Sequence, residues 1–297
     1  MNFNLFVSLL VNGLAMGMVY ALLAMGLIML FRSAGVMNFA QGMMLAVGAY
    51  ISYATQVQAD LPLYAAIPLC LASYVVFGLI FMACIYLPLK DTKFPAAIVV
   101  ATMGTSSILS EACTLIWGGE ALSVPYLVTS EEGKSAYLTI GGVSIQWQYI
   151  LTTIVGVVLI FFVYILFDKL YVGKMMEAAA QDKYTASLIG IPKLVTIAIT
   201  YAIAISLGCI GGFMVSPVTY CSVSLSSLQL RAFASVVIGG TRSIKGAVIG
   251  ALLVGLVEAF ATVNLSNYKD AVVFILLIVF LLVKPDGLVR SKIGDKA

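Results

Sequence analysis

Two carboxylates stand alone inside long apolar stretches of this chain. Glu111 lies in SSILSEACTLIW and Glu258 lies in GALLVGLVEAFA. A carboxylate at membrane depth is costly, so it usually faces a protein interior or an aqueous cavity. Either glutamate could exchange a proton or couple transport to an ion gradient. A hydrated structural role near the outer ends of their helices is the simpler interpretation, and we favour it.

A second polar group separates the first two apolar runs. Residues 32–42, RSAGVMNFAQG, place Asn38 and Gln41 among glycines. This composition predicts irregular backbone, which survives at membrane depth only inside protein or beside water. One interpretation is a broken helix in which Asn38, Gln41 and Gly42 line a translocation path. The other is a cytoplasmic turn with Arg32 at the interface.

Further residue types narrow the possible chemistry. The sequence has no histidine, the commonest general base and metal ligand. Its five cysteines lack metal-ligand spacing, and we interpret them as packing residues. The glycine-rich turn at 239–246 has no Gly-Lys-Ser/Thr following a strand, so it does not predict a nucleotide site. We expect no catalytic residue, cofactor or metal, and any use of ATP then requires another subunit.

The elements that must position these groups are membrane helices. Hydrophobic residues make up 62% of the 297 residues, charged residues make up 10%, and mean hydropathy is +1.09. A bilayer core takes about 20 apolar helical residues. The predicted spans are 6–31, 36–56, 61–87, 96–117, 147–167, 194–215, 228–263 and 269–284. We predict one all-α domain, 1–297, a polytopic integral membrane bundle of about eight transmembrane segments. GGTRSIK divides 228–263 in two, with the first part short or re-entrant.

The segment 168–193, DKLYVGKMMEAAAQDKYTASLIGIPK, is too polar to lie in lipid. Its local signals favour ordered helix over disorder. Asp182 is a helix N-cap residue type, Gly190 suits the left-handed conformation that ends a helix, and Pro192 prevents continuation. We interpret it as a docking surface for a soluble partner.

Charge asymmetry predicts the orientation, because cytoplasmic loops carry an excess of Lys and Arg. With 168–193 in the cytoplasm, only Lys134, Arg231 and Lys269 of the 16 basic residues lie at or near the outer side. The N-terminus is then outside and the C-terminus inside. The net charge of +3 follows from this asymmetry and needs no nucleic acid as a partner. The largest external connection, 118–146, alternates around a Gly-Gly pair and predicts a short hairpin or a partly ordered loop.

An ordered set of motifs runs over almost the whole chain. The motifs are GLAMGMVYAL from Gly13, GVMNFAQG from Gly35 with VGAY from Val47, AAQD from Ala179 with IGI from Ile189, FASVVIGG from Phe233 with SIKGAVIG from Ser243, and KPDGL from Lys284. In this order the chain resembles permease subunits of the branched-chain amino acid class of ABC importers. Its length resembles the shorter of the two permeases. Gln41 departs from the histidine common in that family, and Thr241, Arg242 and Lys245 form a more basic turn, so the solute stays open.

The resemblance implies a non-enzymatic subunit of a prokaryotic cytoplasmic membrane that moves branched-chain amino acids. Its implied partners are a second homologous permease, ABC ATPase subunits, an extracytoplasmic solute-binding protein and the lipid bilayer. Residues 174–191 would be the segment that couples to the ATPase. The coupling residues would be Lys174, Glu177, Ala178, Ala179, Asp182, Lys183 and Gly190.

Three alternatives remain beside this interpretation. Related systems of the same class take up urea or short amides. A self-sufficient secondary carrier would use Glu111 or Glu258 for ion coupling. A membrane-embedded enzyme is the third class, but the sequence shows no nucleophile–base pair or metal constellation to support it.

Overall fold

The chain folds around one central helix, α1 (Phe3–Ala34). A computed structural model describes residues 3–35, 37–90, 92, 94, 96–129, 135–140, 143–181, 186, 188, 190–241, 243–264, 266–284 and 287–289. Residues 17–30 of α1 are all buried. A helix that is apolar all round must be covered on every side. Here α9, α10, α11 and α6 provide that cover.

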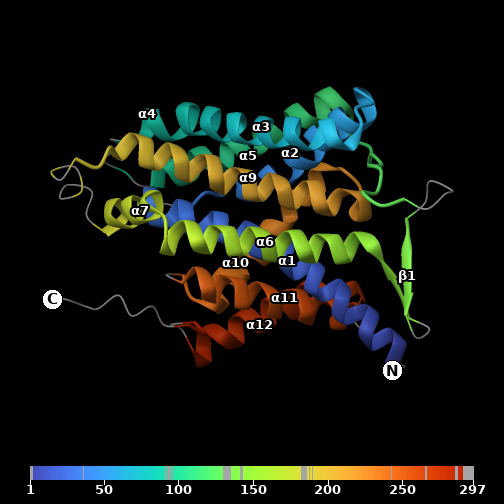
Figure 1. The fold of residues 1–297 in the computed structure, drawn as a ribbon. Helices are drawn as coiled ribbons and strands as arrows, with labels where there is room; N and C mark the ends of the chain where they lie inside the picture. Colours follow the sequence, from blue (N-terminus) through green and yellow to red (C-terminus); the bar gives the residue numbers. More distant parts are fainter. Residues whose placement is uncertain are drawn as a thin grey trace.

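The helices run lengthwise through the molecule (Figure 1). They are α2 (Gln41–Tyr53), α3 (Leu63–Phe81), α4 (Leu87–Leu89), α5 (Ala96–Trp117), α6 (Trp147–Asp168), α7 (Tyr171–Gln181), α9 (Lys193–Thr219), α10 (Leu228–Gly239), α11 (Ile244–Asn264) and α12 (Lys269–Val283). Two π-helical turns, Ala54–Gln58 and Met82–Tyr86, extend α2 and α3. Two 3-10 turns, η3 (Val223–Ser227) and η4 (Ser266–Tyr268), precede α10 and α12.

The two ends of the bundle differ. The α7 end carries the amphipathic helix α7, and the hairpin end carries strands β1 (Tyr137–Ile140) and β2 (Val143–Gln146) together with the start of α1 (Figure 1). The strands pair antiparallel, with Ile140 opposite Val143. This confirms the predicted hairpin. Nearby, Leu122 and Cys221 exchange two backbone hydrogen bonds of 2.9 and 2.8 Å, which join the loop after α5 to the loop after α9.

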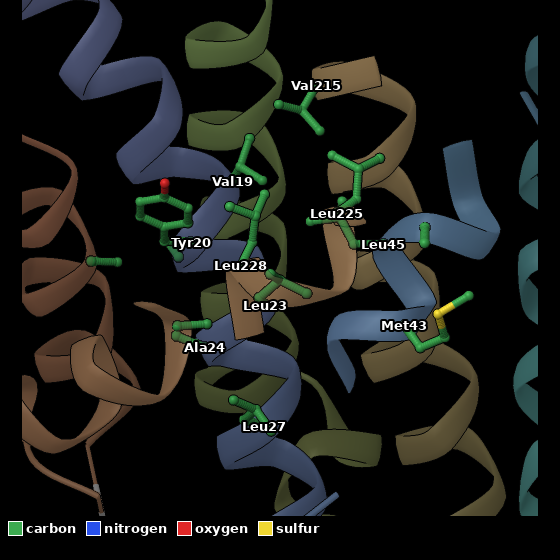
Figure 2. Close-up of a cluster of buried hydrophobic side chains, with 14 of the residues drawn as sticks. Val19, Tyr20, Leu23, Ala24, Leu27, Met43, Leu45, Val215, Leu225 and Leu228 are labelled. Atoms are coloured by element: carbon green, nitrogen blue, oxygen red, sulfur yellow. The ribbon is translucent and has the colours of Figure 1, made fainter. Parts of the chain in front are cut away.

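Helix α2 is buried as completely as α1. It packs on α9 through glycines: a Cβ added at Gly48 would lie 2.2 Å from the Cys209 carbonyl oxygen, and one at Gly212 would lie 1.9 Å from the Leu45 carbonyl oxygen. Figure 2 shows Leu225 and Leu228 between α1 and α2, so η3 and the start of α10 fill the space that separates those helices. The core therefore includes α1, α2, α9, α10 and α11.

The prediction that 228–263 divides is confirmed. Helix α10 has only 12 residues, and α11 returns beside it after the turn at 240–243. The close approach predicted from the glycines is confirmed too, because a Cβ at Gly239 would lie 2.0 Å from the Gly246 carbonyl oxygen. Beyond α12 the chain returns to α10: Leu288 N–H donates to Ile238 O at 2.9 Å and Val289 N–H to Gly239 O at 3.2 Å.

The polytopic helical bundle is confirmed, and one predicted boundary is wrong. Among the described residues, six helices are long and apolar enough to cross a bilayer, and shorter apolar helices accompany them. The span predicted over 36–56 begins as helix only at Gln41, because residues 37–40 are not helical. The hydropathy of this stretch does not reveal the break, since its polar groups are satisfied by distant parts of the chain.

Candidate functional site

The break between α1 and α2 is partly buried: Asn38 and Ala40 are buried, whereas Gly35 and Phe39 are exposed. Gly35 ends α1 in the left-handed region, at φ 77°, and its N–H donates to Phe31 O. The chain then doubles back, because a Cβ added at Gly26 would lie 2.4 Å from Gln41 Nε2. Gly26 precedes the end of α1 by eight residues, or about 12 Å of helix. The irregular backbone predicted from sequence is therefore present, and its polar residue Asn38 is buried.

The predicted pathway residues Asn38 and Gln41 form a closed polar network. Their exposed fractions are 2% and 0%. Asn38 Nδ2 donates to Gln41 Oε1 at 3.4 Å, and Gln41 Nε2 donates to the Ala204 carbonyl oxygen of α9 at 2.8 Å. Asn38 Oδ1 accepts the Ala40 N–H at 3.0 Å, which satisfies a donor at the start of α2. In this conformation the two amides are sealed from solvent and tie α2 to α9.

Gly42, the third predicted pathway residue, brings α2 against α10. Its N–H donates to Gln229 Oε1 at 2.7 Å, and Gln229 Nε2 donates to Asn38 O at 3.5 Å. A Cβ at Gly42 would lie 2.5 Å from Ser226 O, so only glycine fits there. The starts of two broken helices, α2 and α10, thus meet beside hydrogen-bonding amides.

Sequence reasoning did not find Gln229 or Thr102 as members of this network. Thr102 Oγ1, on α5, accepts the Phe39 N–H at 3.1 Å. Both residues contact the break from elements distant in sequence, so no local spacing connects them. Only their polarity inside an apolar run was a signal.

Glu258 lies in a charged cluster that joins four helices. Its Oε1 is 3.0 Å from Arg231 Nε on α10, and its Oε2 accepts the Tyr20 hydroxyl of α1 at 2.6 Å. Arg231 Nη2 also pairs with Asp270 at the start of α12. The side chains of Arg231 and Glu258 are only 11% and 12% exposed. The geometry agrees with the structural interpretation of Glu258, because both of its oxygens already have partners.

Glu111 has a different environment. It is exposed on α5 and is not part of the Arg231 cluster. The two apolar-run glutamates are therefore not equivalent, although their sequence contexts are alike.

The polar segment 168–193 contains an ordered helix, as predicted. Helix α7 covers Tyr171–Gln181 and contacts α1, α6 and α9. It is anchored by Met176, which is 2% exposed, and by Gly173, where a Cβ would lie 2.0 Å from Leu166 O. Lys174 is exposed and Ala178 is half-buried on this helix.

The remaining predicted coupling residues are placed only in part. Gly190 has φ 83°, the left-handed conformation predicted for it, and α9 begins after Pro192. Asp182 and Lys183 lie outside the described residues, as do the side chains of Glu177 and Ala179.

Comparisons with known proteins cover nearly the whole chain. The family described as "Branched-chain amino acid transport system / permease component" matches residues 9–281. BraD, a high-affinity branched-chain amino acid transport system permease protein of Pseudomonas aeruginosa, is 31% identical over 94% of each chain. LivH of Escherichia coli, described in the same words, is 29% identical over 96% of each chain. A solved complex, PsaBC from Streptococcus pneumoniae with Fab, aligns over 92% of this chain and 89% of its own at 13% identity, with a TM-score of 0.47, too distant to support an argument.

Proposed function

Because this chain belongs to the permease component family of branched-chain amino acid transport systems, we propose that it is one membrane subunit of an ATP-driven importer of branched-chain amino acids. ATP hydrolysis takes place in separate ATPase subunits, and a solute-binding protein delivers the solute from outside. Relatives over their full length that carry this description support the proposal.

The observation that carries the coupling step is the position of α7. The helix is held against α6 at Gly173, its Met176 is buried, and it also touches α1 and α9. Those two helices flank the break before α2. A push on the exposed side of α7 therefore reaches the helices whose contacts close the polar network. We propose that the exposed side of α7 with Lys174 and Ala178 docks the ATPase. The family resemblance adds Glu177, Ala179, Asp182, Lys183 and Gly190 to this proposed docking segment.

In this proposal the solute path passes the first residues of α2 and the first residues of α10. A zwitterionic amino acid with an apolar side chain needs hydrogen-bonding groups for its charged ends and an apolar surface beside them. Asn38 and Gln41 supply amides, and Gly42 lets the start of α10 pack close beside them. Opening requires Gln41 to release Ala204 O.

The charge asymmetry supports an orientation with the α7 end in the cytoplasm and the N-terminus outside.

Reconstitution with the cognate ATPases, second permease and binding protein tests this function. We expect ATP-dependent uptake of leucine, isoleucine or valine into proteoliposomes, in preference to urea and short amides. Preference for urea or an amide would overturn the solute assignment. Uptake by this chain alone, driven by an ion gradient, would overturn the ATP-driven mechanism.

A charge-reversal variant tests the docking segment separately. Glu177→Lys combined with Asp182→Lys should abolish ATPase co-purification while the permease still inserts in the membrane. A matched control, Lys269→Glu at the start of α12, changes a charge at the hairpin end and should leave ATPase binding intact. Normal ATPase co-purification with the double variant would contradict the docking assignment.

A further inference from the structure

Two exposed lysines at the α7 end have no acidic partner. Lys245 lies in the first turn of α11, and Lys284 directly follows α12. Within the ranges that the structure describes, neither ammonium group pairs with a carboxylate. The sequence around them adds more basic than acidic residues on the same predicted side, namely Arg242, Arg290, Lys292 and Lys296 against Asp286 and Asp295. This end of the α10–α12 region therefore carries a net positive charge.

Lys245 is positioned between two helices by an aromatic ring. Its Nζ lies 4.7 Å from the centroid of the Tyr164 ring on α6, which is a cation–π contact. Helices α6 and α11 both pack on α1, so this contact spans the surface between them. The ring orients the ammonium group without neutralising its charge. Lys245 therefore presents an oriented positive charge that is still available to an anion.

Exposed apolar side chains continue from this pair toward the middle of the bundle. On α6, Val157 and Phe161 precede Tyr164 by seven and three residues, which places all three on one face. Their exposed fractions are 49%, 63% and 37%. On α11, Ile249 follows Lys245 by about one turn and is 48% exposed. A ligand that fits this surface needs a negatively charged end and an apolar body.

Lys284 repeats this arrangement at the end of α12. The two residues before it, Leu282 and Val283, are 79% and 78% exposed. A Cβ added at Gly287 would lie 2.4 Å from the Gly240 Cα, so the chain after α12 packs against the turn that leads into α11. The start of α11 and the end of α12 both lie at the α7 end of the bundle (Figure 1). Two lysines at this end thus border apolar surface.

We propose that an anionic phospholipid binds here, with its phosphate at Lys245 and its acyl chains along Phe161 and Ile249. The inference uses the proposed orientation, in which the α7 end is cytoplasmic and meets the inner leaflet. A lipid with a net negative charge is attracted to lysines beside the membrane surface, whereas a zwitterionic headgroup also brings a cation. Lys284 adds to the attraction from the end of α12.

A lipid accounts for the whole surface better than a soluble anion does. Free phosphate would neutralise Lys245 but would leave Phe161 and Ile249 without an apolar partner. An acidic protein surface would have to reach past the headgroups to cover the same two side chains. The excess of positive charge on cytoplasmic loops explains which side the lysines occupy, but it does not require Lys245 to be held over an aromatic ring.

Photocrosslinking tests the site in the assembled transporter, reconstituted in phosphatidylcholine vesicles. The probe is a phosphatidylglycerol with a diazirine in its acyl chain. Ultraviolet light should label the peptides that contain Phe161 and Ile249, and excess unmodified phosphatidylglycerol should suppress the label. Lys245→Gln should lower the label about fivefold, the factor expected for one lysine beside an anionic membrane, and Lys245→Arg should retain it. A matched control, Lys90→Gln, removes an exposed charge after α4 at the same end and should leave the label unchanged (Figure 1).

Four results would overturn the lipid site. Equal label in Lys245→Gln and the natural chain would show that the lysine plays no part. Equal suppression by added short-chain phosphatidylcholine would indicate an unselective lipid surface, and suppression by inorganic phosphate would indicate a site for a free anion. Label that appears only after the ATPases dissociate would show that a protein covers this surface.

ATP-dependent uptake in the same vesicles separates this inference from the proposed function. Uptake together with any of those four results leaves the function standing and removes the lipid site. Specific label without uptake supports the lipid site and counts against the function.

Discussion

Two neighbouring glycines on α9 provide a matched test of the α2–α9 contact. A Cβ at Gly212 would lie 1.9 Å from Leu45 O, whereas a Cβ at Gly211 would meet Val19 Cγ1 at 3.5 Å, an ordinary contact. Gly212→Ala must push α2 and α9 apart by roughly 1 Å or more to restore normal contact distances. Gly211→Ala needs no such movement.

The magnitude follows from two opposing terms. Alanine gains about 1 kcal/mol over glycine inside a helix, and both variants share this gain. Overpacking a tight core costs about 1–3 kcal/mol, and only Gly212→Ala incurs it. The difference between the two variants is therefore about 1–3 kcal/mol. At about 2–4 °C per kcal/mol for a chain of 150–250 residues, Gly212→Ala should unfold about 2–12 °C below Gly211→Ala.

A thermal unfolding experiment on the two purified variants in the same detergent measures this difference. The readout is the loss of the monodisperse peak in size-exclusion chromatography as temperature rises. Gly211→Ala should match or exceed the natural chain, and it controls for the change in helix propensity. A Gly212→Ala variant that is as stable as Gly211→Ala would refute the close approach of Gly212 to Leu45, and with it the glycine-mediated packing of α2 on α9.

Three further substitutions test the site and the C-terminal half. Glu258→Leu should destabilise the chain by about 2–4 kcal/mol, because it leaves Arg231 buried with Asp270 as its one remaining acidic partner. Glu258→Gln should lose less stability in the same thermal assay, and equal losses for the two variants would contradict an ionic contribution of Glu258. Gly240→Leu should cost about 1–3 kcal/mol and reduce uptake, because Gly240 has φ 108°; unchanged stability and uptake would show that this conformation is incidental. Gln41→Leu removes the bond to Ala204 O and should alter the ratio of solute moved to ATP hydrolysed, while an unchanged ratio would argue against an opening step at this bond.

Much of the architecture could be predicted because apolar length is a local property. The spans, the division of 228–263 and the hairpin all follow from hydropathy, glycine clusters and alternation along the chain. Gly190 is another local case, since its left-handed conformation depends on the residue type.

The geometry of the candidate site depends on distant contacts and could not be predicted in the same way. Nothing near Gln41 in sequence indicates Ala204 or Gln229 as a neighbour. Likewise Glu258 and Glu111 sit in similar apolar runs, and only the fold shows that one meets Arg231 while the other faces outward. Partner choice between single charges is decided by helix packing, which hydropathy does not specify.

The return of the chain to α10 has a consequence for biogenesis. The last carbonyls of a helix have no partner within it, and those of Ile238 and Gly239 are buried. Their partners are the N–H groups of Leu288 and Val289, some fifty residues later. During translation, α10 and α11 thus leave the ribosome with this helix end incomplete, and it is closed only when the chain has been made through residue 289. A nascent chain stopped after α12 but before residue 288 would lack both of these partners, so completion of the α10 end follows the synthesis of α12.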